Sequence, residues 1–477
     1  MDTESVSSAV NGRHLWELPG PGGLPVFGNI HQLAFTPVHL KLERWADEFG
    51  SPYRISRLGH PFIVWSDTEL CHQVMRERPF RYRRHAYLQA LSAEIGADGV
   101  FFAEGDDWLP QRKLIVAALS VPNIKHCFSD LRLMTQHFYQ RLDRRAAQGK
   151  PVEMIAELKR YTLCAMRLLV FGDGADVLEK DDALFSHLSL VFPEIHRRAI
   201  APFPYWRYPS LGNRRFSQAV KEIHRYIASM IRVAKRRTTE SSGGSRNLLE
   251  AMVAWQRLPG SQVTDEQIAA NVFTLFLAGE DTTAHSLAWA IYSALANDGM
   301  DRLLAGNADA VLGRDIVCPT YEKLGELDLF EAVCTEASRF RPVFPLHVLE
   351  PREDVLIGSV HVPKGTGIIF LNRPSTLRAD YFGCPHAFEP ERWLESARMR
   401  FEPHRSKAFM QFGSGPRVCP GRHLAGVEMR LVLSMLTKNF HMALAVSASS
   451  IKEDFMITMR PSALPLYLKR RTCDLTP

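Results

Sequence analysis

The chain of 477 residues is long enough for several domains, although single large folds of this size exist. Hydrophobic residues make up 46% of it and charged residues 23%, a globular composition that excludes general disorder. The formal net charge is +6 without a long Lys/Arg block, so a nucleic-acid role has little support. A basic patch that docks an acidic protein partner fits this charge balance.

Eight cysteines are scattered along the chain without a C-x-x-C pair. This pattern is typical of free thiols in a reducing compartment and argues against a disulfide framework or a zinc site. Residues 1–17 are polar and lack the apolar run of a signal peptide or a transmembrane anchor, so we expect a cytoplasmic chain. A natural anchor preceding this sequence is compatible with the same observations. We predict a polar extension over 1–17 and a single domain over 18–477.

Hydrophobic periodicity predicts a mainly helical protein. Helices are expected over 39–49, 68–76, 152–171, 182–192, 217–238, 264–297 and 327–340, with a last one from 424 onward. Strands are expected over 53–56, 62–65, 355–358, 362–366 and 368–371. Residues 79–105 show no clear period, and a long irregular segment of this kind is usually functional. Loops are expected over 200–209, which is rich in proline and aromatic residues, and over the flexible linker 241–245.

The most informative stretch runs from Phe412 to Gly421 and reads F-G-S-G-P-R-V-C-P-G. Three glycines and two prolines exclude a helix or a central strand, so these residues form a tight loop before an apolar helix. Backbone N–H groups of such a loop approach the Cys419 sulfur closely and stabilise a thiolate. A lone cysteine is otherwise most often a small buried hydrophobic residue.

The loop fits F-x-x-G-x-R-x-C-x-G at every fixed position and resembles the cysteine-ligand loop of the cytochrome P450 family. In that family the cysteine thiolate is the proximal ligand of heme iron. The resemblance therefore implies that Cys419 binds the iron of a heme b. It also implies that four other residues of the loop adjoin the heme: Phe412, Gly415, Arg417 and Gly421.

A long apolar helix is expected over 264–297, where Thr264 and Gln267 form a capping-box pair. It contains A-G-E-D-T-T from Ala278 to Thr283. These polar residues suit a buried helix poorly, so they mark either a function or a solvent-facing patch. Threonine hydroxyls in such a segment bond to carbonyls of the preceding turn and bend the helix.

This segment resembles the family's A-G-x-D-T motif, where the helix opens beside the iron and makes room for dioxygen. The resemblance implies that Ala278 and Gly279 adjoin the heme. It also implies that Thr282 orients and protonates dioxygen, while Asp281 passes protons inward as part of a general-acid relay. Glu280 fills the variable position of the motif, and the sequence gives it no role.

Trp108 and Arg112 lie four residues apart and share one face if the segment is helical. A solvated arginine would satisfy this spacing equally well. In the family, W-x-x-x-R holds a heme propionate, a task that suits the bidentate guanidinium group. Leu349 stands where many members place another propionate-binding arginine. Three other residues are then candidates for that contact: His347, Arg352 and Arg417.

Glu336 and Arg339 lie three residues apart on an expected helix, a spacing that usually gives a surface salt bridge worth under about 1 kcal/mol. In the family, E-x-x-R pairs with the arginine of a later P-E-R-[FW] stretch, which is present here as P-E-R-W around Arg392. The resemblance implies that Glu336, Arg339 and Arg392 support the cysteine loop structurally and take no part in catalysis.

The helix face of Thr282 also presents Thr274 and Ala278, with Phe273 and Leu277 close by, and these residues are expected to line the substrate pocket. Family positions add four more: Val343, Phe344, Met456 and Ile457. The pocket is mainly apolar, so a lipophilic terpenoid, fatty acyl chain or polyketide fits it. The loop over 200–209 is a candidate substrate-access lip, with peripheral membrane contact as an open alternative.

These motifs span nearly the whole chain and imply the family fold, which is mainly α with a smaller β-rich part and heme between two long helices. The resemblance implies a heme-thiolate monooxygenase that inserts one oxygen atom from O2 into its substrate by hydroxylation or epoxidation. Electrons would come from a separate ferredoxin or flavoprotein reductase, and from NAD(P)H only indirectly. Two rivals stay open: a heme-thiolate isomerase or dehydratase that does not activate O2, and a heme-based gas or redox sensor.

Overall fold

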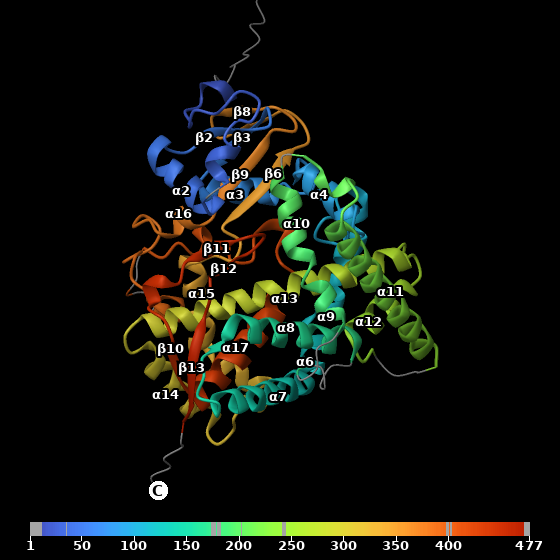
Figure 1. Ribbon diagram of the computed structural model, residues 1–477, viewed down its shortest axis with the longest axis vertical. Coiled ribbons are helices and arrows are strands. Elements are labelled where there is room, and N and C mark those ends of the chain that lie inside the picture. Colours follow the sequence, from blue (N-terminus) through green and yellow to red (C-terminus); the bar gives the residue numbers. More distant parts are fainter. Residues whose placement is uncertain are drawn as a thin grey trace, which may run out of the picture.

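The computed structural model describes residues 12–34, 36–172, 178, 183–201, 203–240, 245–396, 400 and 403–471. These residues form a large helical part and a smaller β-rich part, which lies at one end of the molecule with the N-terminal strands (Figure 1). The mainly helical architecture agrees with the expectation from the sequence. No helix among the residues described here has the length and apolarity needed to cross a membrane.

The longest helices form the framework of the helical part: α7 (Phe128–Ala146), α8 (Met154–Phe171), α11 (Leu211–Glu240), α13 (Asp265–Ala296) and α17 (Arg422–Asn439). Shorter helices surround them or cover the β-rich part: α1 (Ile30–Leu33), α2 (Val38–Phe49), α3 (Thr68–Arg76), α4 (Ala86–Ala93), α5 (Trp108–Ala118), α6 (Val121–His126), α9 (Ala183–Leu188), α10 (Val191–Ile200), α12 (Leu248–Gln256), α14 (Met300–Leu312), α15 (Asp328–Phe340) and α16 (Arg373–Thr376).

The main sheet has the strand order β2-β3-β9-β6-β4, in which β3 and β9 are parallel and the other neighbours antiparallel. Its strands are β2 (Tyr53–Arg57), β3 (His60–Trp65), β4 (Tyr82–Arg84), β6 (Leu346–Pro351) and β9 (Gly367–Leu371). Smaller sheets have the orders β1-β8-β7, β10-β13-β5 and β11-β12. Their strands are β1 (Arg13–His14), β5 (Val152–Glu153), β7 (Val355–Ile357), β8 (Val360–Val362), β10 (Phe440–Leu444), β11 (Glu453–Phe455), β12 (Met459–Pro461) and β13 (Pro465–Arg470).

Helix α13 crosses the middle of the helical part, with α8 alongside it (Figure 1). It begins with the expected capping box, in which Thr264 and Gln267 each accept a hydrogen bond from the other's backbone N–H at 3.2 Å. Most of its side chains are buried. Close packing depends on Gly279, because a Cβ atom there would lie 2.5 Å from the Met166 sulfur of α8. The A-G-E-D-T-T segment is therefore held against α8.

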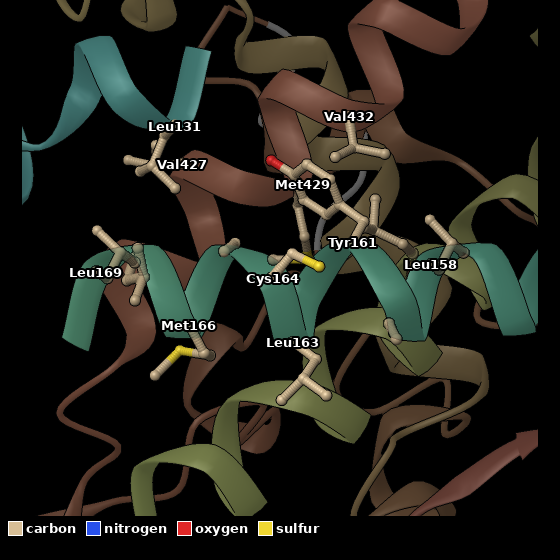
Figure 2. Close-up of a cluster of buried hydrophobic side chains, with 14 of the residues drawn as sticks. Leu131, Leu158, Tyr161, Leu163, Cys164, Met166, Leu169, Val427, Met429 and Val432 are labelled. Carbon is tan, nitrogen blue, oxygen red and sulfur yellow. The ribbon is translucent and has the colours of Figure 1, made fainter. Parts of the chain in front are cut away.

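Helix α8 is apolar on two faces, as an interior helix must be. Figure 2 shows that Tyr161 points toward Met429 and Val432 of α17, while Leu163 and Met166 point the opposite way. All five side chains are buried. Because both faces are packed, α8 has a fixed position from which its polar side chains reach α13.

Two expectations for the chain between 79 and 200 need correction. The segment 79–105 contains β4 and α4, because Arg84 pairs with Leu349 of β6, and such long-range pairing leaves no local period. The helix expected over 182–192 is two helices, α9 and α10. Pro193 cannot continue a helix from α9, but it fits the first turn of α10.

Smaller differences concern element ends. The helix expected over 217–238 is α11, which extends beyond both of these ends. The strand expected over 362–366 is β8, which ends at Val362 because Pro363 has no backbone N–H to donate. Residues 241–244 of the expected linker lie outside the described residues, as do Asp182 and Pro202. The remainder of the loop over 200–209 includes a 3-10 turn at Tyr205–Arg207.

Candidate functional site

The loop from Phe412 to Gly421 is tight, as expected. The Cys419 N–H donates to the Phe412 carbonyl at 2.9 Å, which closes the loop directly before α17. The Cys419 side chain is half-buried, and burial raises the pKa of its thiol. The backbone N–H groups of Gly421 and Arg422 and the charges of Arg112 and Arg422 oppose this rise. Thiolate-stabilising groups therefore surround the sulfur.

Gly415 allows the loop to approach the end of α3. Its φ is +69°, and a Cβ atom there would lie 2.4 Å from the Met75 carbonyl oxygen. Glycine adopts this backbone conformation without steric cost. The neighbouring Ser414 hydroxyl shares a hydrogen bond of 2.8 Å with His72 of α3. The loop that carries Cys419 is therefore fixed to α3 as well as to α17.

Helix α5 brings Trp108 and Arg112 to the same loop. Arg112 Nη2 donates to the Val418 carbonyl at 2.6 Å. Trp108 is buried, and the guanidinium carbon of Arg417 lies 4.7 Å from its ring centroid, within cation–π range. The structure thus places Trp108, Arg112 and Arg417 beside Cys419, and the solvated alternative for Arg112 is wrong because this arginine is half-buried against the loop.

A cluster of arginines extends from Arg417. Arg417 Nη2 donates to one oxygen of the Glu104 carboxylate at 2.8 Å. Arg78 Nη2 lies 3.7 Å from the other oxygen of that carboxylate. Burial lowers the pKa of Arg84 well below its ordinary value, and the neighbouring charges of Arg78 and Arg417 lower it further. Arg112 and Arg352 also lie close enough to lower the pKa of Arg417. Two of these cations, Arg78 and Arg417, therefore share one carboxylate.

Within the described residues, the arginine cluster (Arg78, Arg84, Arg112, Arg352 and Arg417) has more cations than carboxylates, and Arg78 and Arg417 share that of Glu104. The Nε groups of Arg78, Arg352 and Arg417 are buried and have no hydrogen-bond partner within the part of the chain that the structure describes. Unpaired buried guanidinium groups cost free energy. The arrangement fits a cofactor that brings carboxylates to this position, as heme does through its propionates.

Sequence reasoning missed Arg78 and Arg84. The available signal was the run from 78 to 84, in which four of seven residues are arginine. Leu349 is buried in the apolar core of the β-rich part. Burial, with Arg78 and Arg84 nearby, lowers the pKa of His347 to about 3. A neutral His347 does not supply the charge that an arginine at 349 would carry, whereas Arg78 and Arg84 do.

Helix α13 has one open face. Ala278 is exposed and Thr282 is half-buried, although most of the helix is buried. The Thr282 hydroxyl donates to the Ala278 carbonyl at 2.6 Å, in the manner expected for threonine in a helix. An opening in the middle of a buried helix is what a bound cofactor and substrate require.

The other face of the same segment is acidic and buried. Lys159 Nζ of α8 lies 2.7 Å from Asp281 Oδ1 and 3.2 Å from Glu280 Oε1. Both carboxylates are buried, so the solvent-facing patch considered from the sequence is wrong for them. The Thr162 hydroxyl of α8 also donates to the Glu280 carbonyl at 2.9 Å.

Apart from the exposed Ala278, the residues of α13 expected to line the substrate pocket are buried. The Phe273 ring contacts His224 of α11, with ring centroids 5.3 Å apart. The Thr274 hydroxyl has no hydrogen-bond partner among the described residues. A Cβ atom at Gly99 would lie 2.3 Å from this hydroxyl, so the segment before α5 packs directly on α13. Leu277 is buried beside them.

The other expected substrate residues come from two segments that the structure joins. The Met459 N–H donates to the Val343 carbonyl at 2.8 Å, which links the β11–β12 hairpin to the segment before β6. Thr458 of the same hairpin shares a hydrogen bond of 3.0 Å with His285 of α13. Phe344, Met456 and Ile457 are half-buried around these links.

The expected substrate-access lip lies beside α4. The Trp206 indole donates to the Glu94 carboxylate at 2.7 Å, and Arg207 pairs with the same carboxylate. Phe203 and Tyr208 are exposed. The lip therefore meets the segment 79–105, which was expected to be functional, at the end of α4.

Glu336, Arg339 and Arg392 meet in the interior, each fully buried. Arg339 donates to both Glu336 oxygens at 2.8 and 2.9 Å, and Arg392 Nε donates to Glu336 Oε1 at 3.1 Å. The Trp393 indole donates to Glu336 Oε2 at 2.8 Å. A surface salt bridge at this spacing is therefore excluded. The same helix contacts the residue directly before the cysteine loop, since Gln411 Nε2 donates to the Ser338 hydroxyl at 3.0 Å.

Comparison with known proteins decides the family. The family model described as Cytochrome P450 matches residues 18–466. The chain belongs to the cytochrome P450 family. Its fold, mainly α with a smaller β-rich part, is the cytochrome P450 fold, and both expectations from the sequence are confirmed.

Several curated relatives are cytochromes P450 or hydroxylases. Cytochrome P450 97B2, chloroplastic, of Glycine max is 26% identical over 90% of this chain and 83% of its own length. Abscisic acid 8'-hydroxylase 1 of Arabidopsis thaliana is 24% identical over 95% of this chain and 91% of its own length. A bifunctional cytochrome P450/NADPH–P450 reductase of Aspergillus oryzae is 24% identical over 93% of this chain, but 41% of its own length.

Family membership fixes the class of chemistry. The chain is a cytochrome P450 monooxygenase, an oxidoreductase of the family that uses thiolate-ligated heme, O2 and electrons from a reductase. Lipophilic substrates are general in the family.

Replacement of Glu336 tests the support of the cysteine loop. Glu336→Gln removes the charge that Arg339 and Arg392 share, and an uncompensated buried charge costs about 3–5 kcal/mol. We expect the free energy of unfolding, measured by chemical denaturation, to fall by that amount. Glu331→Gln on the same helix is the control, since its ion pair with Arg430 is half-exposed and worth under about 1 kcal/mol. Equal effects of the two variants would contradict the role of Glu336.

Proposed function

We propose that this cytochrome P450 holds heme b through Cys419 and inserts one oxygen atom of O2 into a lipophilic small molecule, by hydroxylation or epoxidation. The observation that carries the proposal is the Cys419 thiol beside an arginine cluster that has more cations than carboxylates within the described residues. When bound, heme supplies a thiolate-ligated iron that activates dioxygen. The overall reaction takes up substrate, O2, two electrons and two protons, and releases oxygenated product and water.

The arginine cluster would hold the propionates. Arg112 and Arg417 are already oriented by Val418 and Glu104, so their remaining donors are available without further loss of side-chain freedom. Arg78 and Arg84 take the place that the family gives to an arginine at 349. His347, neutral at ordinary pH, donates or accepts a hydrogen bond there but adds no charge.

Thr282 and Asp281 would move protons. The Thr282 hydroxyl lies on the open face of α13, one turn from the exposed Ala278. Asp281 lies next to it in the chain and binds Lys159 on the buried face. Asp281 therefore connects the interior between α8 and α13 with the open face, which is the position a proton relay needs.

The substrate would be lipophilic, because Phe273, Leu277, Val343 and Ile457 are apolar and Thr274 is the polar exception. The names of the relatives do not single out a terpenoid, a fatty acyl chain or a polyketide for this chain. The substrate would enter beside the lip formed by 203–208 and α4, where Phe203 and Tyr208 are exposed. Peripheral contact of this lip with a membrane stays a prediction.

Electrons would come from a ferredoxin or a flavoprotein reductase on a separate chain, and from NAD(P)H only through it. Exposed basic side chains lie on the elements that meet the cysteine loop: Arg76 at the end of α3, Lys113 on α5 and Arg422 at the start of α17. Charge complementarity with an acidic partner speeds association. The seven cysteines of the described residues are free thiols, which supports a reducing compartment such as the cytoplasm.

The first test is the absorption spectrum of the reduced protein with carbon monoxide. We expect the strongly red-shifted Soret band of thiolate-ligated heme, and we expect Cys419→Ala to abolish it. Cys164→Ala, a substitution of a buried cysteine of α8, is the control and should leave the band in place. A band at the position of histidine-ligated heme, or the same band after Cys419→Ala, would overturn the assignment of the ligand.

Replacement of Thr282 tests its proposed role in proton delivery. Thr282→Ala removes the hydroxyl on the open face, so electrons should leak to hydrogen peroxide and product per electron should fall several-fold. Thr283→Ala is the matched control because Thr283 is buried on another face of α13. The same product yield per electron in both variants would contradict the role of Thr282. Peroxide and product are measured with a substrate found by its spin-state shift.

Replacement of Arg78 tests the propionate assignment. A lost hydrogen bond between charged groups costs about 1.5–3 kcal/mol, so Arg78→Met should weaken heme binding about 10-fold or more. Arg76→Met changes an exposed arginine two residues away and should leave heme binding unaltered. Heme transfer to an apo-myoglobin acceptor measures the difference. Equal retention in both variants would remove Arg78 from the site.

A further inference from the structure

Two adjacent carboxylates of α13 share a single cation. Glu280 and Asp281 both contact Lys159 Nζ, at 3.2 and 2.7 Å. The side chains of Glu280 and Asp281 are 3% and 9% exposed, whereas that of Lys159 is 23% exposed. Lys159 therefore connects two buried acids with solvent.

We call Glu280, Asp281 and Lys159 the triad. Its charges balance only if one proton is added. Two carboxylates and one ammonium group leave one buried negative charge, and a second buried carboxylate ionises with difficulty beside the first. Glu280 is the more buried of the two and lies farther from Lys159. The extra proton is therefore held by Glu280, while Asp281 stays paired with Lys159.

We propose that Glu280 is a proton reservoir that recharges Asp281 through Lys159 between proton deliveries to the open face of α13. The inference rests on the proposed monooxygenase function, because that reaction consumes two protons per turnover. It gives a catalytic task to the variable residue of the A-G-E-D-T-T segment, to which the motif itself assigns none.

The step conserves protons and charge. After Asp281 has taken up a proton from Lys159 and passed it toward Thr282, Lys159 Nζ accepts the proton of the Glu280 carboxyl group. The ammonium form of Lys159 is thereby restored and Glu280 becomes a carboxylate. Bulk water at the exposed end of Lys159 then returns one proton to Glu280. No oxidant, reductant or further co-reactant is needed.

The surroundings of the triad support a single exchangeable proton near neutral pH. Burial, with Asp281 next to it, raises the pKa of Glu280 to about 7 against the opposing effect of Lys159. Burial lowers the pKa of Lys159, but the two carboxylates more than offset this, so the amine stays charged. The nearby His285 has its pKa lowered to about 4 by burial and is neutral at the same pH. Arg460 and Asp454 face His285 and offset each other as a pair at 2.9 Å.

The first experiment is an infrared titration of the heme-loaded protein, which needs no turnover. Because its pKa lies above the ordinary value, Glu280 is protonated below about pH 7 and ionises above it. We expect a protonated-carboxyl stretch that disappears as pH rises through this range and is absent in Glu280→Gln. The buried Glu428, with a pKa raised by burial to about 8, gives a separate signal that both proteins retain. Lys159→Met should move the Glu280 transition to higher pH.

The second experiment measures product and peroxide against pH in the presence of a spin-shifting substrate and an electron donor. Glu280→Gln should lower the rate of product formation by about 10-fold or more and raise the kinetic solvent isotope effect. Glu280→Asp keeps an acid at the position and should recover part of the loss. Glu266→Gln, at the exposed first turn of α13, is the control.

The outcomes distinguish this inference from the proposed function. If Thr282→Ala uncouples the enzyme while Glu280→Gln leaves the infrared titration and the pH profile unchanged, the monooxygenase function stands and the reservoir is wrong. If the carbon monoxide band is absent, the function fails whatever Glu280 does. The infrared signal of the carboxyl group could also disappear in Glu280→Gln while the rate of product formation and the isotope effect stay unchanged. This outcome would overturn the proposal that Glu280 is a proton reservoir.

Discussion

One buried carboxylate, that of Glu336, joins helix α15 to the segment that precedes the cysteine loop. It accepts hydrogen bonds from Arg339 of its own helix, and from Arg392 and the Trp393 indole of the segment that leads to the cysteine loop. Arg339 in turn donates to the carbonyls of Thr376 and Pro385. A carboxylate at the centre of the protein is stable only when charge and hydrogen bonds compensate its lost hydration. Here they do, so α15 and the distant segments it contacts are held in one arrangement.

The balance of buried charges near Cys419 differs from the balance around Glu336. Around Glu336 each buried charge has a partner, whereas near Cys419 two guanidinium groups, those of Arg78 and Arg417, share the carboxylate of Glu104. Between α8 and α13 the imbalance has the opposite sign, with two carboxylates on Lys159. Buried charge that the protein does not neutralise itself marks the places where a cofactor or a proton completes the structure.

How much the sequence revealed depended on whether the information was local. The loop at Cys419, the capping box of α13 and the E-x-x-R pair are short motifs, and the structure places each on the element expected. Arg78 and Arg84 escaped notice because β4 exists only through its pairing with β6, more than 260 residues away (Arg84 opposite Leu349). The break between α9 and α10 was local, since Pro193 stood just beyond the helix that periodicity suggested. The misfit of the A-G-E-D-T-T segment did not point to Glu280 in particular, because its partner Lys159 lies on another helix.

The helical repeat of α13 explains how one segment serves two purposes. Ala278 and Thr282 are one turn apart and share the open face, while the intervening Gly279 and Glu280 turn toward α8. Gly279 has no side chain, so α13 approaches Met166 closely and Lys159 comes within reach of Glu280 and Asp281. A larger residue at Gly279 would clash with the Met166 side chain, which would have to move. The spacing of small, acidic and hydroxyl residues therefore couples the packing of α13 on α8 to the proton supply that we propose for its open face.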